Sequence, residues 1–276
     1  MGIHQSSEQP DGMGGSSGGH RADYGLPGER QQPAADIPVS PTGSAPLQGL
    51  RGVMAGWWFP LAVGFVLVLL LARFDQAVDQ IKLSKVLRGD VRRELEALQQ
   101  FGQGTVSVLI GLVVLLLDPA RRRWLLCWAV TAGVLMLTVT GLKMIVGRAR
   151  PRLTDPYDPL LFLGPLGKYP WSGGKGGQPE LLSPLEFWKK GVSDLWSMPS
   201  SHTAFAFLAA WVLSRMYPKL APVVWGLAVT VGVCRLVFDA HYLTDVIAGA
   251  CIAIAACRLI MPRFATGPRS AYLPPA

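Results

Sequence analysis

The sequence predicts an all-α membrane protein, a polytopic bundle of six transmembrane helices with one long extracytoplasmic loop. Of its 276 residues, 50% are hydrophobic and only 16% are charged, whereas soluble domains carry about a quarter charged residues. Apolar runs near spanning length are the second observation. The net charge of +8 comes from Lys and Arg that lie beside these runs. This placement indicates membrane orientation, and we expect no nucleic-acid partner.

The chain divides into three regions. Residues 1–50 are rich in Gly, Ser, Pro and Gln, and they predict a disordered cytoplasmic tail because they hold too little apolar surface to fold alone. Residues 51–263 form the predicted six-helix domain, and residues 264–276 a short cytoplasmic tail. All four cysteines fall in apolar segments, so we expect small buried side chains and no disulfide framework.

Six apolar segments are the expected spans: Val53–Ala72, Thr105–Leu117, Trp124–Leu142, Ser201–Met216, Ala221–Phe238 and Tyr242–Ile260. The second is short and can be extended backwards through Phe101. Ahead of it, apolar residues at helical spacing (Val91, Leu95 and Leu98) predict an amphipathic helix on the membrane surface or over the bundle. The loop Met144–Met198 is long enough to be functional or disordered, and Leu185–Trp196 is compatible with one short helix.

Basic residues predict the orientation of the bundle. They cluster at Arg121–Arg123, at Arg215 with Lys219, and at Arg258 with Arg263. With six spans, all three clusters lie on the side of the N-terminus, and positive residues favour the cytoplasm. Both termini are therefore expected in the cytoplasm, and the Met144–Met198 loop faces outward.

The stretch from Arg235 to Asp245 places ionisable residues between two apolar segments, where they are costly and therefore functional candidates. His241 and Asp245 are four apart, which predicts one face of a helix that begins near His241. Arg235 can join them only if the chain turns around Phe238–Ala240. The alternative is a plain helical turn with an Arg that reaches toward water; Asp239 is taken as a turn residue.

Two further clusters are predicted on the same outer face. Lys143 and Arg150 are seven apart where the third span ends, although cations are also favoured there by the helix dipole alone. Ser200 and Ser201 are candidate N-caps, and the free backbone N–H groups at such a helix start can bind an anion. Capping does not explain His202 in the first turn.

Six spans bring the three clusters together. Three cations, N–H donors and two histidines describe a site for a multiply charged anion, best matched by phosphate. The rival is a metal site made of His202, His241, Asp239 and Asp245. Three fixed positive charges oppose a divalent cation there, so we expect no metal and no cofactor.

The segments Lys143-x6-Arg150-Pro151, Pro199-Ser200-Ser201-His202 and Arg235-x5-His241-x3-Asp245 resemble the three signature motifs of the type 2 phosphatidic acid phosphatase superfamily, in its six-span bacterial membrane branch. The resemblance implies phosphate binding by Lys143, Arg150, Arg235, Ser200 and the backbone of Ser201. It implies that His241 is the nucleophile that Asp245 orients, and that His202 is the general acid and base. Ser201 stands where the family usually has Gly, and Cys234 where it usually has Ser.

The resemblance thus implies a metal-independent lipid phosphatase that acts through a phosphohistidine on the outer face of a bacterial inner membrane. Its substrate would be phosphatidic acid, phosphatidylglycerol phosphate, or a prenyl phosphate such as undecaprenyl diphosphate. A phosphotransferase of the same family and an inactive lipid-binding relative are alternatives. A transporter of phosphate-containing molecules is disfavoured, because the sequence shows no internal repeat and its ionisable residues collect at one side.

Overall fold

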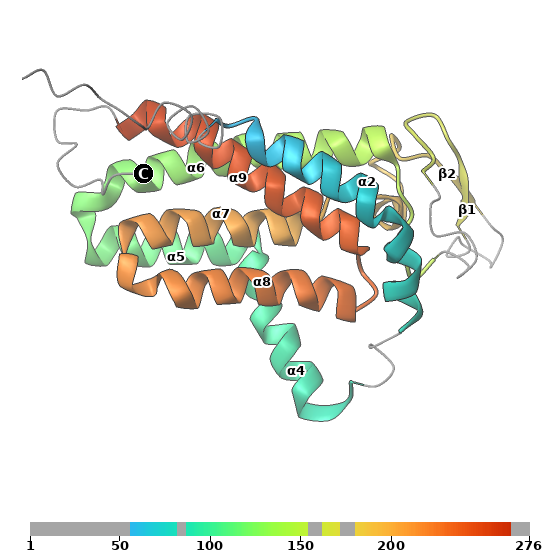
Figure 1. Ribbon diagram of the computed structural model, residues 1–276, viewed down its shortest axis with the longest axis horizontal. Coiled ribbons are helices and arrows are strands. Elements are labelled where there is room, and N and C mark those ends of the chain that lie inside the picture. The colour runs from blue at the N-terminus through green and yellow to red at the C-terminus, as the bar shows by residue number, and fades with distance from the viewer. Residues whose placement is uncertain (1–55, 82–86, 154–161, 172–179, 266–276) are drawn as a thin grey trace, which may run out of the picture. The chain divides into compact units, whose positions relative to one another are not determined.

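The computed structural model describes residues 56–81, 87–153, 162–171 and 180–265. The chain divides into two units, Met1–Ser44 and Ala45–Ala276, and all described residues belong to the second. The predicted tails 1–50 and 264–276 lie outside the described residues, except that the last helix reaches Ala265. The order of helices and strands is shown in Figure 1.

Four helices are long and apolar enough to cross a membrane. They are α2 (Phe59–Gln80), α6 (Arg122–Val146), α8 (Ala221–Val237) and α9 (Leu243–Ala265), of which α6 and α8 follow the 3₁₀ turns η2 (Pro119–Arg121) and η5 (Pro218–Leu220). Large apolar side chains stay exposed on these helices, such as Phe65 at 66% and Leu137 at 77%, which is typical of lipid contact. The prediction of a multi-pass membrane protein is confirmed.

The fifth helix of the bundle, α7, is short but central. It spans Ser201–Met216, as the sequence predicts, and it contacts α6, α8 and α9. Its 16 residues extend for about 24 Å, less than the ~30 Å hydrocarbon core of a bilayer. Four fully buried alanines, at 204, 206, 209 and 210, let the neighbouring helices approach closely.

The second predicted span differs from the sequence prediction. The amphipathic helix exists as α4 (Gly89–Leu98), and it continues into the 3₁₀ turn η1 (Gln99–Gly102) before α5 (Gly104–Leu117). The chain bends by 67° between these two parts, so the extension backwards through Phe101 is wrong. A Cβ atom on Gly102 would lie 2.4 Å from the carbonyl oxygen of His202. This close packing of η1 on α7 leaves no room for a straight continuation of α5.

The long loop is not purely irregular, and the all-α prediction is incomplete. Two short strands, β1 (Tyr169–Trp171) and β2 (Glu180–Leu182), pair antiparallel. Within the predicted Leu185–Trp196 helix only the 3₁₀ turn η4 (Val192–Leu195) forms. Ala149, Leu182 and Leu195 build a small second core, which holds the loop against the end of α6. Figure 1 shows the hairpin at one end of the helices.

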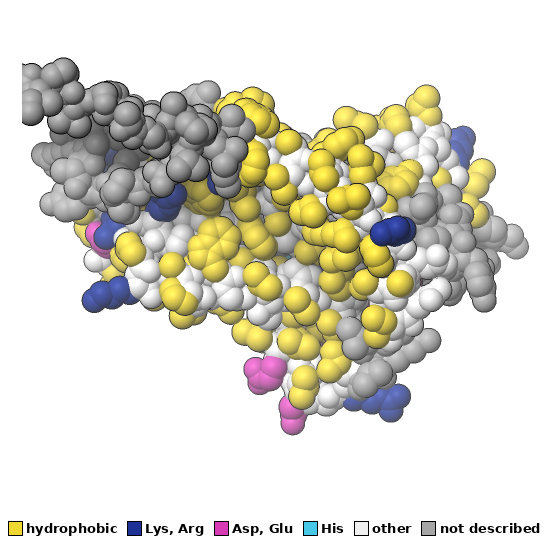
Figure 2. Space-filling model, in the orientation of Figure 1, with side chains coloured by type: hydrophobic (Ala, Val, Ile, Leu, Met, Phe, Trp, Pro, Cys, Tyr) yellow, Lys and Arg dark blue, Asp and Glu magenta, His cyan; other side chains and the backbone are white. Residues whose placement is uncertain are grey.

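Apolar and charged side chains are separated on the surface. Figure 2 shows hydrophobic side chains along the middle of one face, over α2 and α9, with most charged side chains toward the ends and on α4. On α4, Arg92 and Glu96 form an exposed ion pair at 2.9 Å. An apolar belt between charged ends fits helices that lie in a bilayer.

Candidate active site

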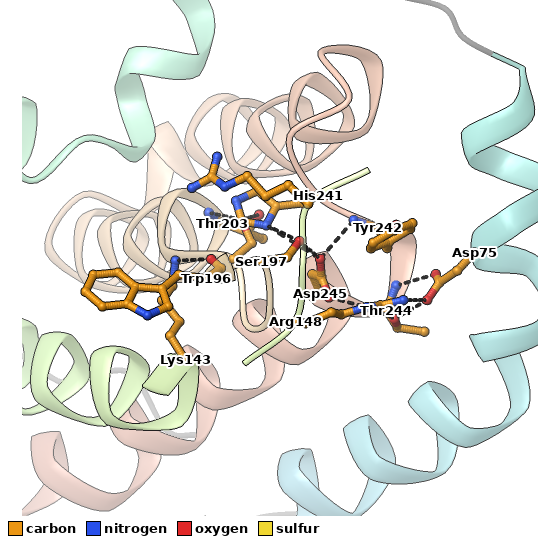
Figure 3. A network of polar contacts seen from close by, with 12 residues as sticks. Asp75, Lys143, Arg148, Trp196, Ser197, Thr203, His241, Tyr242, Thr244 and Asp245 are labelled. Carbon is orange, nitrogen blue, oxygen red and sulfur yellow. Dashed lines mark hydrogen bonds and ion pairs between the residues drawn. The ribbon is translucent and has the colours of Figure 1, made fainter. Parts of the chain in front are cut away.

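A network of polar side chains lies where the C-terminal ends of α2, α6 and α8 meet the N-terminal ends of α7 and α9 (Figures 1 and 3). The members named in Figure 3 come from four stretches that are far apart in the sequence, around residues 75, 143–148, 196–203 and 241–245. Most are buried although they are polar or charged: Asp75, Lys143, Arg148, Ser197, Thr203, His241, Thr244 and Asp245. Such a cluster in a membrane protein is a functional-site candidate.

The turn between α8 and α9 sets the position of His241. Helix α8 ends at Val237, and Asp239 takes the left-handed conformation with φ of 50°, which Asp tolerates better than most residues. The backbone amides of Ala240 and His241 both donate to the carbonyl of Arg235 at 3.1 Å. The predicted turn around Phe238–Ala240 is therefore confirmed.

The sequence predicted His241 and Asp245 on one helix, but His241 lies just before the helix that carries Asp245. Helix α9 begins at Leu243. The Asp245 carboxylate accepts the backbone N–H of Tyr242 at 2.9 Å, which resembles half of a capping box and marks the start of the helix. His241 is held in the preceding turn, and the pair still meets, with Nδ1 at 3.6 Å from Oδ2.

Asp245 accepts hydrogen bonds from several parts of the network. Its Oδ1 accepts from Arg148 at 2.6 Å, and its Oδ2 accepts from the Ser197 hydroxyl at 2.5 Å and from the Tyr242 amide at 2.9 Å. Its backbone carbonyl also accepts the amide of Ser200 at 3.0 Å. A buried carboxylate with several donors is held in its ionised form and in one orientation.

The ring of His241 is buried and neutral. Its Nδ1 faces the Ser197 hydroxyl at 3.5 Å and the Asp245 carboxylate at 3.6 Å. Burial lowers the pKa of His241 to about 3, and the charges of Arg150 and Lys143 add to this effect against the opposing pull of Asp245. A carboxylate beside one ring nitrogen favours the tautomer that leaves the lone pair on the other nitrogen.

The three predicted cations lie within electrostatic range of His202, since the charges of Arg235, Lys143 and Arg150 all act on its ring. Each is fixed by a neutral oxygen: Lys143 donates to the carbonyl of Trp196 at 3.0 Å, Arg150 to that of Ser193 at 2.9 Å, and Arg235 to the Gln99 amide at 2.8 Å. Among the described residues, no carboxylate forms an ion pair with any of these three cations, so their positive charges remain available to an anion.

Arg235 carries a further sign of an anion site. Its Nε is buried and has no hydrogen-bond partner among the described residues, although its Nη1 is bonded. A buried donor without an acceptor is costly. A phosphate oxygen is an acceptor that matches both the charge and the fork of donors that a guanidinium presents.

At the start of α7, one serine caps the helix and the next two residues are partly exposed. The Ser200 hydroxyl accepts from the Thr203 hydroxyl at 3.0 Å and from its amide at 3.5 Å, so the capping role weighed from the sequence is present. A Cβ atom on Gly249 would lie 2.5 Å from the Ser200 carbonyl, so α9 packs directly against this cap. Ser201 and His202 are partly exposed, unlike the fully buried Ser200.

The Cys234 side chain contacts α4, whereas the family motif would give this position a hydroxyl near the phosphate. It is buried, and its Sγ donates to the carbonyl of Leu95 in α4 at 3.6 Å. The residue therefore ties α8 to α4. The other cysteines, at 127, 251 and 257, are free; the first and last are buried, as the sequence predicts, whereas Cys251 is partly exposed.

Several buried residues of the network were not predicted from the sequence, among them Asp75, Arg148, Ser197 and Thr244. Arg148 bonds Asp75, Thr244 and Asp245, and Ser197 bonds Asp245. A carboxylate at the end of an apolar run is the signal that could have singled out Asp75. Ser197 stands in a polar loop and has no comparable signal.

In the part of the chain that the structure describes, no group of three or more His, Cys, Asp or Glu side chains has a metal-binding arrangement.

The fold and the site define a multi-pass helical membrane protein with a buried histidine–carboxylate pair beside three cations. The family model of the PAP2 superfamily matches residues 122–267, which contain every site residue predicted from the sequence. The chain belongs to the PAP2 superfamily, whose members are phosphatases.

A solved structure shares the fold. It is the crystal structure of the first transmembrane PAP2-type phosphatidylglycerolphosphate phosphatase from Bacillus subtilis, 16% identical in sequence, with a TM-score of 0.51. The similarity covers 77% of this chain and 98% of that one. No curated protein matches the sequence significantly. At this identity the likeness supports the fold, and function must be argued from the site.

Proposed function

We propose that the protein is an integral membrane lipid phosphatase that hydrolyses a phosphomonoester or diphosphate of a lipid without a metal ion. The observation that carries the proposal is that three cations, each held by a neutral oxygen, lie within electrostatic range of His202, and two of them also within range of the buried ring of His241. Lys143, Arg150 and Arg235, with Ser200 and the backbone N–H of Ser201, bind the phosphate. They stabilise the charge on its oxygens as the phosphoryl group is transferred.

In the first step the free ring nitrogen of His241 attacks phosphorus, and the bond from phosphorus to the leaving oxygen breaks. The negative charge of the bound phosphate offsets the three cations that otherwise disfavour a protonated His202 ring, and His202 gives its proton to that oxygen, so that an alcohol or a phosphate leaves. The positive charge that develops on the His241 ring lies beside the ionised Asp245 carboxylate, 3.6 Å from Nδ1. The product of this step is a phosphohistidine.

In the second step His202, now neutral, accepts a proton from water, and the water oxygen attacks phosphorus. The phosphorus–nitrogen bond breaks, the electron pair returns to His241, and inorganic phosphate is released. His202 is protonated again for the next turnover. An acceptor alcohol in place of water would make the protein a phosphotransferase.

The membrane arrangement supports a lipid substrate. We propose six spans, in which α5 with η1 and α7 with η5 complete the passages that are too short as single helices. The site then lies at the extracytoplasmic face of a bacterial inner membrane, with both termini in the cytoplasm. A site at the helix ends meets a headgroup at the interface while the acyl or prenyl chains stay in the bilayer. Phosphatidic acid, phosphatidylglycerol phosphate and undecaprenyl diphosphate all have this form.

The test is phosphate release by the purified protein from these three lipids in mixed micelles that contain a chelator. We expect release from at least one lipid, inhibition by vanadate, and loss of turnover in His241→Ala. The control for folding is an unchanged elution volume and melting temperature within a few degrees. Loss of wild-type activity in the chelator would support the metal-dependent alternative, and near-normal activity of His241→Ala would rule out the phosphohistidine.

A further inference from the structure

Helix α2 lies outside the residues that the family model matches, yet it supplies a charged residue to the buried network around Asp245. Only three of its residues are buried, Pro60, Gly64 and Asp75. The first two are small or apolar and suit helix packing. Asp75 is a carboxylate with no exposed surface, in a helix that otherwise faces outward, so packing alone does not account for it.

Asp75 makes three hydrogen bonds, all to the part of the molecule that holds Asp245. Its Oδ1 accepts the backbone N–H of Thr244 at 3.0 Å, and its Oδ2 accepts the Thr244 hydroxyl at 2.5 Å and Arg148 at 2.8 Å. Thr244 lies in the first turn of α9, where N–H groups lack partners within the helix. Asp75 thus caps α9 from another helix, directly next to Asp245.

Arg148 joins the two carboxylates. Its side chain is fully buried, with Nη2 at 2.8 Å from Asp75 and Nη1 at 2.6 Å from Asp245, and its guanidinium lies 3.9 Å above the Tyr242 ring. Attraction by Asp245 and Asp75 outweighs burial and raises the pKa of Arg148, so its charge is permanent. Figure 3 shows the three side chains in a row, with His241 beyond Asp245.

The charges in this row set the electrostatic potential at the His241 ring. With Arg148 and Asp245 alone, one positive and one negative charge would cancel beside the histidine. Asp75 adds a second negative charge, so the row carries a net charge of −1. That net charge stabilises the positive charge that develops on a histidine as its ring nitrogen attacks phosphorus.

We propose that Asp75 is a positioning residue for the His241–Asp245 pair: it compensates Arg148 and fixes the first turn of α9, so that Asp245 keeps both its charge and its orientation toward His241. This inference rests on the function proposed above. Asp75 does not itself touch the predicted phosphate binders; it acts on the transition state through Arg148 and Asp245.

The variant Asp75→Asn tests the proposal, because Asn retains an acceptor for the Thr244 amide and removes the charge. We expect kcat to fall at least 10-fold while KM changes less than 3-fold. In calorimetry, the Kd of vanadate, which mimics the transition state, should rise at least 10-fold, and the Kd of inorganic phosphate should stay within 3-fold. The control is Asp79→Asn, one turn further along α2, with kcat within 2-fold of the wild type.

The double variant Asp75→Asn/Arg148→Gln separates charge from packing. It restores the net charge of −1 and still offers an amide donor to Asp245, so its kcat should exceed that of Asp75→Asn at least 3-fold. If Asp75 serves only packing, the double variant has lost more contacts and should be less active than the single one. That order, or wild-type kcat in a folded Asp75→Asn, would overturn the proposal, as would failure of both variants to fold.

The outcomes for the two proposals are distinct. If the wild type neither hydrolyses a lipid phosphate nor binds vanadate more tightly than phosphate, the proposed function fails and the role of Asp75 fails with it. If the wild type does both and Asp75→Asn matches it, only the role of Asp75 fails.

Discussion

Nδ1 of His241 lies 3.6 Å from Oδ2 of Asp245, a separation too long for a hydrogen bond. The Ser197 hydroxyl donates to the same Oδ2 at 2.5 Å and lies 3.5 Å from the same Nδ1. The Ser197 hydroxyl therefore lies between the Asp245 carboxylate and the His241 ring and contacts both. Ser197 fixes the carboxylate that we propose to orient the histidine, and its own amide donates to the carbonyl of Arg148 at 2.9 Å.

Ser197→Ala should therefore slow the chemical step. We expect kcat to fall about 10-fold, equivalent to ~1.4 kcal/mol of transition-state stabilisation, because Asp245 loses one of its three side-chain and backbone donors. KM should change little, since Ser197 does not contact the predicted phosphate binders. The measurement is steady-state phosphate release from the preferred lipid.

The matched control is Ser214→Ala, at the far end of α7, where the hydroxyl donates to the carbonyl of Trp211 in its own helix. This variant should retain wild-type kcat. Equal activity of Ser197→Ala and the wild type would show that the 3.6 Å contact between histidine and carboxylate suffices without the serine.

The sequence predicted the local features of this site well. Hydrophobic run lengths located α7 at both ends, and the spacing of Arg235 and His241 required the turn that the structure contains. Both inferences depend on residues that are near in sequence. The start of α9 lies later than predicted, at Leu243, because the backbone amide of Tyr242 donates to the Asp245 side chain. Hydrophobic periodicity does not reveal such a side-chain cap.

Long-range contacts could not be predicted in the same way. Arg148 meets Asp75 across 73 residues and Asp245 across 97, and neither spacing is a local pattern. The bend at Gln103 depends on η1 packing against the backbone of His202, a contact between two different parts of the chain. Charge–charge pairs and close backbone approaches of this kind are set by the packed bundle, and a single sequence does not specify the partner.

Gly249→Ala should destabilise the protein and impair the site together. Its new Cβ would lie 2.5 Å from the carbonyl of Ser200, an atom of the backbone that cannot rotate away. Overpacking of this kind costs about 1–3 kcal/mol, and it displaces the Ser200 cap from Asp245. We expect a melting temperature several degrees lower and a reduced affinity for inorganic phosphate.

Gly226→Ala in α8 is the matched control for this glycine, because its Cβ would meet nothing within 4 Å. The same substitution in an open helical position stabilises by up to about 1 kcal/mol. The two variants should thus shift the melting temperature in opposite directions. A shared direction would mean that helix propensity, and not the contact with Ser200, determines the effect.

His241 makes stability depend on pH. Its pKa is lowered from 6.5 to about 3 in the folded protein, chiefly by burial, so between these values the unfolded chain binds a proton that the folded protein does not. Stability contributed by this group therefore falls as the pH decreases from 6.5 toward 3. Lowering the pH from 6.5 to 5 should reduce the free energy of unfolding by up to about 2 kcal/mol.

The measurement for His241 is the melting temperature in detergent at pH 7 and pH 5, for the wild type and for His241→Asn. The wild type should lose more stability than the variant over this interval, since Asn does not titrate. An equal loss in both proteins would assign the pH dependence to other groups.

Cys234→Ser tests which way this position faces. In the structure the thiol donates to the carbonyl of Leu95 in α4, and a hydroxyl can make the same bond from the same place. We therefore expect kcat/KM within about 2-fold of the wild type, a difference of less than ~0.5 kcal/mol. The Ser that the family motif favours would instead raise kcat/KM several-fold if its hydroxyl reached the phosphate. A gain of that size, with an equal gain in affinity for inorganic phosphate, would place residue 234 among the phosphate binders and contradict its contact with α4.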